Sequence, residues 1–323
     1  MTQMPTYCGI AWSADGFAVE ILDGQGSPAA PPSVIKGGDV EALAGTLAGL
    51  AGEVRAVVDS TNGAVDGTLL AAGISVFRAD PPELGRRPAF GSVSARELAD
   101  LARLRPDVVT PVQLEEGSLT GRSLGCAAGA SVTACWNGSR DEPRIALTFD
   151  DGPHPRFTGE VLDVLSRYGI PATFFCVGIH AVSQPRVLAR IADLGHCVAN
   201  HTWSHPFLPD LSAAEVREQI ERTREVIGDQ SLLMRPPYGV RVPSLPDSGE
   251  KVILWDVEAH DWALPGTEYI AECVLAATQP GSIIVLHDGG GDRSQTVAAL
   301  PAIIGGCLAR GLVFGTVPEV IAA

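Results

Sequence analysis

The C-terminal part of the chain alternates short apolar runs with amphipathic stretches, and this alternation most constrains its fold. The apolar runs are 145–149, 172–177, 197–199, 231–234, 252–257, 282–286 and 312–317. Helical patterns lie between most of them, at 158–167, 186–194, 213–227, 268–277 and 296–309. Because strands that alternate with helices pair in parallel, the pattern predicts an α/β fold with a parallel sheet closed into a barrel.

Chemically active residues follow several of the predicted strands. Asp150 and Asp151 follow the first one, and His201 and His205 follow the third. In barrels, the loops at the carboxyl ends of the strands converge on one mouth, where the chemistry takes place. Two imidazoles and one carboxylate suit a catalytic zinc ion with open coordination positions. The remaining carboxylate can then act as a base on metal-bound water.

Further motifs occur downstream in a fixed order. They are the segments 235–239 (RPPYG), 261–262 (DW) and 286–288 (LHD). Together with the aspartate doublet and the histidine pair, they resemble the five motifs of the NodB-like polysaccharide deacetylases, the family 4 carbohydrate esterases. The resemblance runs from about residue 144 to residue 320. It implies a distorted (β/α) barrel with about seven strands.

The resemblance also implies how the first motifs share the chemistry. Asp151, His201 and His205 are the expected metal ligands, and Asp150 is the expected general base. Arg235 is expected to orient Asp150 through a salt bridge, because its planar fork suits a carboxylate. The ion is predicted to be a divalent metal, with Zn²⁺ as the first choice and Co²⁺, Ni²⁺ or Fe²⁺ as alternatives.

The later motifs supply the acid and the substrate contacts in the same scheme. His287 is the expected general acid that protonates the departing amine, with Asp261 holding the imidazole in position. The backbone N–H of Tyr238 is expected to stabilise the oxyanion. Trp262 and Val285 are expected to form an apolar pocket for the acyl methyl group.

Two motif positions differ from the usual pattern of the family. Glu258 stands where the fourth motif usually begins with aspartate, and Val285 replaces the usual leucine. Neither difference removes a catalytic group, although the smaller valine leaves more room near the acyl group. The other histidines are interpreted as core or surface residues without a catalytic role; they are His154, His180, His196 and His260.

We therefore expect metal-dependent hydrolysis of an N-acetyl amide on an amino sugar or a small N-acetylated metabolite. Metal-bound water deprotonated by Asp150 attacks the acyl carbon, and His287 protonates the amine. One alternative is hydrolysis of another C–N bond, in a formamide or a cyclic imide. Some relatives of that kind lack the first aspartate, so the presence of Asp150 argues against it. A non-enzymatic interaction protein is the other alternative, and the complete catalytic set argues against that.

The N-terminal part has a different pattern of elements. A hairpin is predicted around Asp15, followed by alternating helices and strands as far as residue 104. The order is similar to the RNase H-like α/β domain of DEDD-type transposases. Ala11 stands where that nuclease's first strand carries aspartate, and Asp59 alone cannot hold two metals, so the domain is predicted to be non-catalytic. The predicted boundaries are 1–114 for this domain, 115–143 for a linker and 144–323 for the deacetylase domain.

The net charge of −15 excludes some partners and leaves others open. Without a basic patch, binding to nucleic acid or to an anionic membrane is not expected. No signal peptide or apolar spanning segment is visible, and seven irregularly spaced cysteines do not form a disulfide pattern. These features predict a cytoplasmic protein with a saccharide or small-molecule substrate. Whether it forms a homodimer is left open by the sequence.

Overall fold

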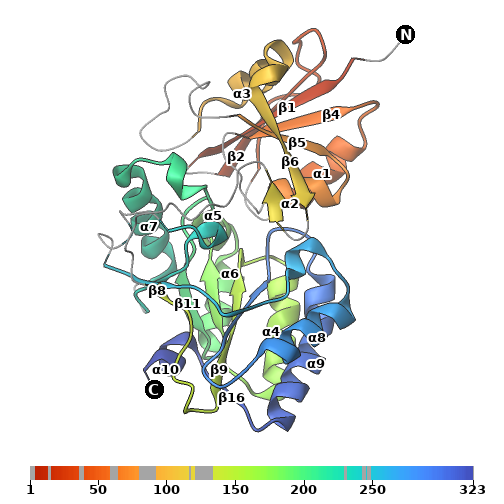
Figure 1. Ribbon diagram of the computed structural model, residues 1–323. Helices are drawn as coiled ribbons and strands as arrows, with labels where there is room; N and C mark the ends of the chain where they lie inside the picture. Colours follow the sequence, from red (N-terminus) through yellow and green to blue (C-terminus); the bar gives the residue numbers. More distant parts are fainter. Residues whose placement is uncertain are drawn as a thin grey trace. The chain divides into compact units, whose positions relative to one another are not determined.

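The computed structural model describes most of the chain (Figure 1). The described residues are 4–13, 16–35, 40–58, 65–79, 92–115, 118–120, 134–228, 231–241, 245 and 249–322. Asp15, Asp59 and much of the segment predicted to be a linker lie outside them. The chain divides into two compact units: residues 1–125 with 210–215, and residues 126–209 with 216–323.

The first unit is a mixed sheet of seven strands in the order β3-β2-β1-β4-β5-β6-β7. Its strands are β1 (Thr6–Ser13), β2 (Gly16–Leu22), β3 (Ser33–Ile35), β4 (Val54–Val58), β5 (Ser75–Ala79), β6 (Val109–Glu115) and β7 (Ser118–Thr120). Its helices are α1 (Val40–Ala48), α2 (Asp66–Ala71), α3 (Ala95–Leu104) and the short η3 (Pro106–Val108). β1 pairs antiparallel with β2 and parallel with β4.

Helix α3 packs closely against β1 in this unit. At Gly9 of β1 an added Cβ would lie only 1.8 Å from the carbonyl oxygen of Ala95, so a glycine is required there. Leu98 and Ala99 of α3 are fully buried in the same cluster as Ala11 of β1. The resemblance of this unit to an RNase H-like domain remains a prediction.

The second unit contains a nine-stranded sheet in the order β14-β15-β9-β10-β11-β12-β13-β8, with β16 paired to β9. Its strands are β8 (Ala134–Cys135), β9 (Arg144–Asp150), β10 (Thr173–Cys176), β11 (Cys197–Asn200), β12 (Leu233–Met234), β13 (Lys251–Ile253), β14 (Val257–Glu258), β15 (Ile283–His287) and β16 (Val313–Phe314). All of these strand pairs are parallel. The sheet curls into a half-barrel, so the predicted parallel, barrel-type architecture is confirmed.

The sheet has more strands than the seven apolar runs predicted. The run 252–257 is divided into two strands, because β13 pairs with β12 whereas β14 pairs with β15. Leu254 to Asp256 connect the two strands. β8 lies within the segment predicted to be a linker, and it pairs with β13 through Cys135 and Ile253. Because β8 has only two residues and no strand-like pattern, the sequence does not indicate this pairing.

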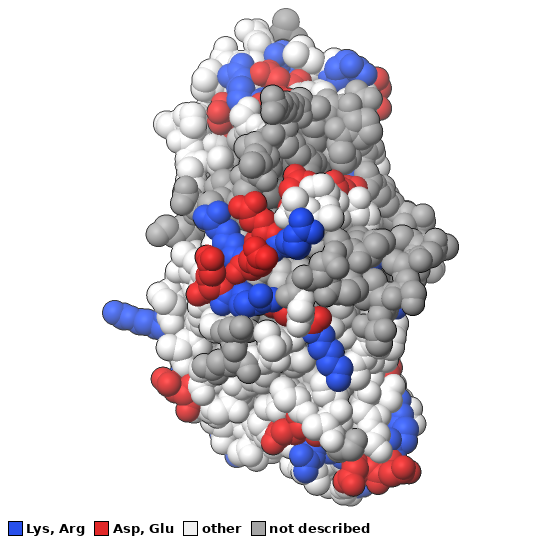
Figure 2. All heavy atoms as spheres, turned by 90° about the vertical axis from the view of Figure 1, so that its left-hand side faces the viewer, with Lys and Arg blue, Asp and Glu red and all other residues white. Residues whose placement is uncertain are grey.

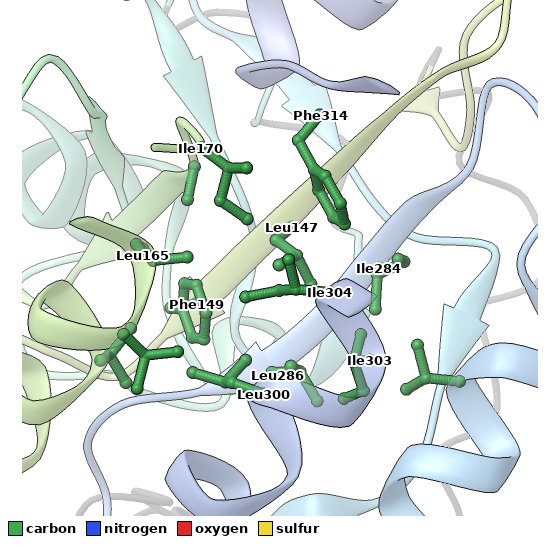
Figure 3. Packing of buried hydrophobic residues seen from close by; sticks show 14 of the residues in the cluster. Leu147, Phe149, Leu165, Ile170, Ile284, Leu286, Leu300, Ile303, Ile304 and Phe314 are labelled. Atoms are coloured by element: carbon green, nitrogen blue, oxygen red, sulfur yellow. The ribbon is translucent and has the colours of Figure 1, made fainter. Parts of the chain in front are cut away.

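Helices cover the outside of the curled sheet (Figure 1). The α-helices of this unit are α4 (Phe157–Tyr168), α5 (Gly178–Ser183), α6 (Pro185–Asp193), α7 (Ala213–Ile227), α8 (Thr267–Ala277), α9 (Ser294–Ala309) and α10 (Val317–Ile321). The short helices η4 (Leu208–Asp210), η5 (Pro237–Gly239) and η7 (Asp261–Ala263) lie in the connecting loops. Ile145, Leu147 and Phe149 of β9 face this layer, and Leu300 and Ile304 of α9 pack against them (Figure 3). Because side chains alternate along a strand, residues 146, 148 and 150 of β9 face the barrel interior.

The surface carries charges of both signs. On the face shown in Figure 2, acidic and basic side chains lie next to one another. Among the described helices, none combines the length and the apolar character needed to cross a bilayer.

Candidate active site

The site begins at the carboxyl end of β9. Asp150 is the last residue of this strand and faces the barrel interior, while Asp151 leaves the strand with a left-handed backbone (φ 72). Both residues are buried, with 3% and 5% of their surface exposed. On the neighbouring strand β15, His287 pairs in register with Asp150. The parallel sheet therefore brings residues more than a hundred positions apart to one edge.

Asp151, His201 and His205 form a compact set of possible metal ligands. Their ligand atoms all lie within 4.8 Å of one another. Asp151 Oδ1 is 3.2 Å from His205 Nε2 and 3.5 Å from His201 Nε2. His201 Nδ1 is 2.7 Å from the carbonyl oxygen of Arg235 and therefore donates to it, which leaves Nε2 as the coordinating nitrogen.

The two histidines lie on a compact loop and not on a helix. Gln219 of α7 supports this loop, because its Oε1 accepts hydrogen bonds from the backbone amides of Trp203 and Ser204 at 2.8 and 2.9 Å. Its Nε2 also donates to Ser204 Oγ at 3.0 Å. The rings of His201 and His205 meet edge to face with centroids 4.8 Å apart, so both reach one centre.

The charge states of these groups suit a divalent cation. Burial by itself raises the pKa of Asp151, but the nearby His205 and His201 outweigh it and hold the pKa well below its usual range. Burial lowers the pKa of His205 to about 3, so its imidazole is neutral and can act as a ligand. Asp151 Oδ1 is also buried without a hydrogen-bond partner among the described residues. An anionic oxygen in that state, beside the imidazoles of His201 and His205, fits a bound cation.

Arg235 fixes the other aspartate. Its Nη1 donates to Asp150 Oδ1 at 2.6 Å and to Thr148 Oγ1 at 2.8 Å, and the guanidinium is fully buried. The ring of Phe175 lies 4.0 Å from the guanidinium carbon and that of Trp255 lies 5.4 Å from it. The pair directs Asp150 to the site, where Asp150 Oδ2 lies 3.8 Å from His201 Nε2.

Arg235→Ala is expected to lower the free energy of unfolding by about 3–5 kcal/mol, because it leaves the Asp150 carboxylate buried without its partner. Urea unfolding of the two full-length proteins measures this difference. The control is the exposed pair of Arg156 and Glu160, where Arg156→Ala is expected to change stability by less than about 1 kcal/mol. Equal losses in the two variants would contradict the structural importance of the buried pair.

His287 and Asp261 form a second ion pair at the same edge, with Asp261 buried and His287 partly exposed. His287 Nδ1 lies 2.8 Å from Asp261 Oδ1, and Asp261 Oδ2 accepts hydrogen bonds from the His287 backbone amide and from Thr296 Oγ1. Burial by itself lowers the pKa of His287, but the charge and the hydrogen bond of Asp261 outweigh it and raise the pKa to about 9. This imidazole is therefore protonated at neutral pH and can donate a proton from Nε2.

The predicted substrate-binding residues lie around these pairs. Tyr238 sits in η5 with a left-handed backbone (φ 59), and its ring centroid lies 4.8 Å from that of His205. Val285 is buried on β15, two residues before His287, and therefore shares its face. Trp262 lies in η7, half-buried, next to Asp261. The acyl pocket assigned to Trp262 and Val285 remains a prediction.

Several supporting residues were not identified from the sequence. Thr148 could have been found, because it lies two residues before Asp150 on the same face of β9. Gln219 and Thr296 lie on α7 and α9, and no local pattern links them to the site. Asp288 was noted only as part of a motif; it is fully buried, and burial raises its pKa to about 7.

Comparison with known proteins finds relatives in both sequence and fold. Residues 137–250 match the polysaccharide deacetylase family. A chitooligosaccharide deacetylase from Sinorhizobium fredii is 38% identical over 196 residues, which cover 55% of this chain and 91% of the relative. A solved peptidoglycan N-acetylglucosamine deacetylase is 35% identical with a TM-score of 0.57, over 58% of this chain and 92% of that one.

The fold is also similar to that of a protein described as a pseudoenzyme. This family 4 carbohydrate esterase pseudoenzyme from Bacillus anthracis is 25% identical with a TM-score of 0.55, over 58% of this chain and 68% of that one. Likeness of fold therefore does not establish activity, which depends on the residues at the barrel mouth.

Proposed function

Because this chain belongs to the polysaccharide deacetylase family of metal-dependent N-deacetylases, we propose that it removes acetyl groups from N-acetylglucosamine units of a saccharide. The observation that carries the proposal is that one barrel edge holds both the Asp151, His201 and His205 set and the Asp150 and His287 pairs. The saccharides named for the relatives, chitooligosaccharide and peptidoglycan, are the two substrate classes to compare.

The catalytic residues act from two sides of the acyl group. Asp151, His201 and His205 would hold the divalent cation, which supplies Lewis-acid activation of the attacking water and the acyl carbonyl. Asp150 accepts the proton of that water, and its ion pair with Arg235 keeps it oriented.

On the other side, His287 donates its proton to the amine nitrogen as the C–N bond breaks. Asp261 keeps the imidazole protonated and in place until that step. The Tyr238 backbone N–H is proposed to stabilise the oxyanion, and the left-handed turn at Tyr238 sets the direction of this group. Acetate and a free amine are the products.

The test of the proposed function is product analysis with the metal-loaded full-length protein. Chitooligosaccharides and peptidoglycan fragments are supplied separately, and released acetate is measured. Acetate release from either one supports the proposal, and the ratio of the two rates identifies the preferred class. Release of formate from a formamide, with no acetate from either saccharide, would contradict it.

Zn²⁺ is the proposed metal, because two imidazole nitrogens and one carboxylate oxygen are typical ligands of catalytic zinc. Metal analysis of the wild-type protein is expected to give about one divalent ion per chain. His205→Ala is expected to lose this ion and to keep its circular dichroism spectrum. A His205→Ala protein with full metal content would show that the ion is bound elsewhere.

A further inference from the structure

Two consecutive aspartates face the same centre, although successive side chains of a strand normally point to opposite faces. Asp150 Oδ2 and Asp151 Oδ1 lie 3.8 and 3.5 Å from the same atom, His201 Nε2. The left-handed backbone of Asp151 (φ 72), directly after β9, is what brings its carboxylate round to this side. Such a conformation is rare for residues other than glycine and persists only when its surroundings hold it.

His180 holds the Asp151 backbone in this turn. Its Nδ1 lies 2.7 Å from the Asp151 carbonyl oxygen, and because a carbonyl only accepts, Nδ1 carries the proton. Gly289 also lies close to this carbonyl, because an added Cβ there would be 2.3 Å from the same oxygen. His180 is 4% exposed, and its Nε2 is buried without a partner among the described residues.

The start of α5, which carries His180, binds both loops that supply the metal ligands. Three consecutive backbone amides before His180 donate to carbonyl oxygens of these loops. The pairs are Val177 to Gly152 at 2.9 Å, Gly178 to Thr202 at 2.9 Å and Ile179 to Trp203 at 3.0 Å. His180 is the next residue along the chain, and it continues this series through its side chain.

We propose that His180 is a positioning residue, whose Nδ1–H holds the Asp151 carbonyl in the left-handed turn and thereby directs the Asp151 carboxylate to the metal. The inference rests on the proposed metal-dependent function. It gives a role to a histidine for which the sequence predicted none. Groups that orient metal ligands through hydrogen bonds typically contribute about 10–100-fold to metal affinity.

The affinity for Zn²⁺ itself tests this role without reference to catalysis. Metal-free full-length protein is titrated with Zn²⁺ in competition with a chromogenic chelator. His180→Leu removes the donor and is expected to raise the Kd for Zn²⁺ about 10–100-fold. His180→Asn carries its amide N–H at the position of Nδ1 and is expected to restore most of the affinity. His180→Gln carries its amide one bond further out and is expected to bind like the leucine variant.

His196 provides a matched control in the same unit. It is 8% exposed, and its Nδ1 accepts a hydrogen bond from the Ala172 amide at 3.1 Å, while its Nε2 is buried without a partner among the described residues. It therefore resembles His180 in burial and in making one hydrogen bond from Nδ1 to a backbone group, although His196 accepts this bond and His180 donates it. His196→Leu is expected to lower the Tm of the metal-free protein and to leave the Kd for Zn²⁺ unchanged.

The possible outcomes distinguish failure of the role of His180 from failure of the proposed function. If His180→Leu lowers the Tm as His196→Leu does but binds Zn²⁺ like the wild type, His180 is only structural and the inference fails. If the leucine variant does not fold, equal affinities of the asparagine and glutamine variants have the same meaning. If the wild type itself binds no Zn²⁺ or other divalent ion, the proposed function fails and not the inference alone.

Discussion

Asp150→Asn is expected to lower kcat/KM for deacetylation by about 10²–10⁴-fold, while the variant still binds about one divalent ion per chain. The asparagine amide cannot accept the proton of the attacking water, but Asp151, His201 and His205 are unchanged. Acetate release and metal analysis on the same preparation measure both quantities. The large effect follows from the position of Asp150, which Arg235 holds beside the ligands.

Asp151→Asn is the matched control, since it makes the same chemical change at the neighbouring residue. It removes the negative charge between His201 and His205, so the affinity for the metal should fall first. Metal added in excess should then recover part of the activity of Asp151→Asn but none of that of Asp150→Asn. The reverse pattern would exchange the two roles.

His287→Ala is expected to lower kcat by about 10²–10⁴-fold and to remove the alkaline limb of its pH profile. The acid must carry a proton, so the wild-type rate should fall as the pH rises through the pKa of His287. That pKa is about 9 without a metal, because Asp261 raises it against the effect of burial. A divalent cation beside Asp151 repels the imidazolium, so the limb of the metal-loaded enzyme should lie at or below this value.

Asp261→Asn tests the role of Asp261 separately from that of the acid, His287. The change removes the negative charge next to His287 Nδ1, so the pKa of His287 should fall and the alkaline limb should move to lower pH. The profile of kcat against pH for the three proteins measures both effects. An alkaline limb that is the same in all three would mean that another group supplies the proton.

The alternation of apolar runs and the order of the motifs determined the architecture and the candidate residues. A parallel sheet brings the carboxyl ends of its strands to one edge, so Asp150, His201 and His287 could be predicted to converge. The predicted helices 213–227 and 268–277 agree with α7 and α8 to within one residue. Periodicity is a local property, and these elements follow it because their buried faces repeat at the helical spacing.

The tertiary structure decided how these residues are held. Gln219 of α7 supports the His201 loop, and Arg235 is buried between Phe175 and Trp255 while it binds Asp150. The resemblance predicted the ion pair of Arg235 with Asp150. The contacts of Gln219, Phe175 and Trp255 join segments whose spacing along the chain follows no pattern, so the sequence could not indicate them. The short strand β8 was missed for the same reason, since its pairing with β13 depends on a distant segment.

The turn at Asp151 combines a property that the sequence predicted with one that only the tertiary structure decided. The sequence placed two carboxylates side by side and predicted that one binds a metal and the other acts as a base. It could not tell how both reach the same centre, because adjacent residues of a strand point in opposite directions. The left-handed backbone of Asp151 brings its carboxylate to the same centre as that of Asp150. His180 holds this backbone and Gly289 lies close to it, and both residues come from other parts of the chain.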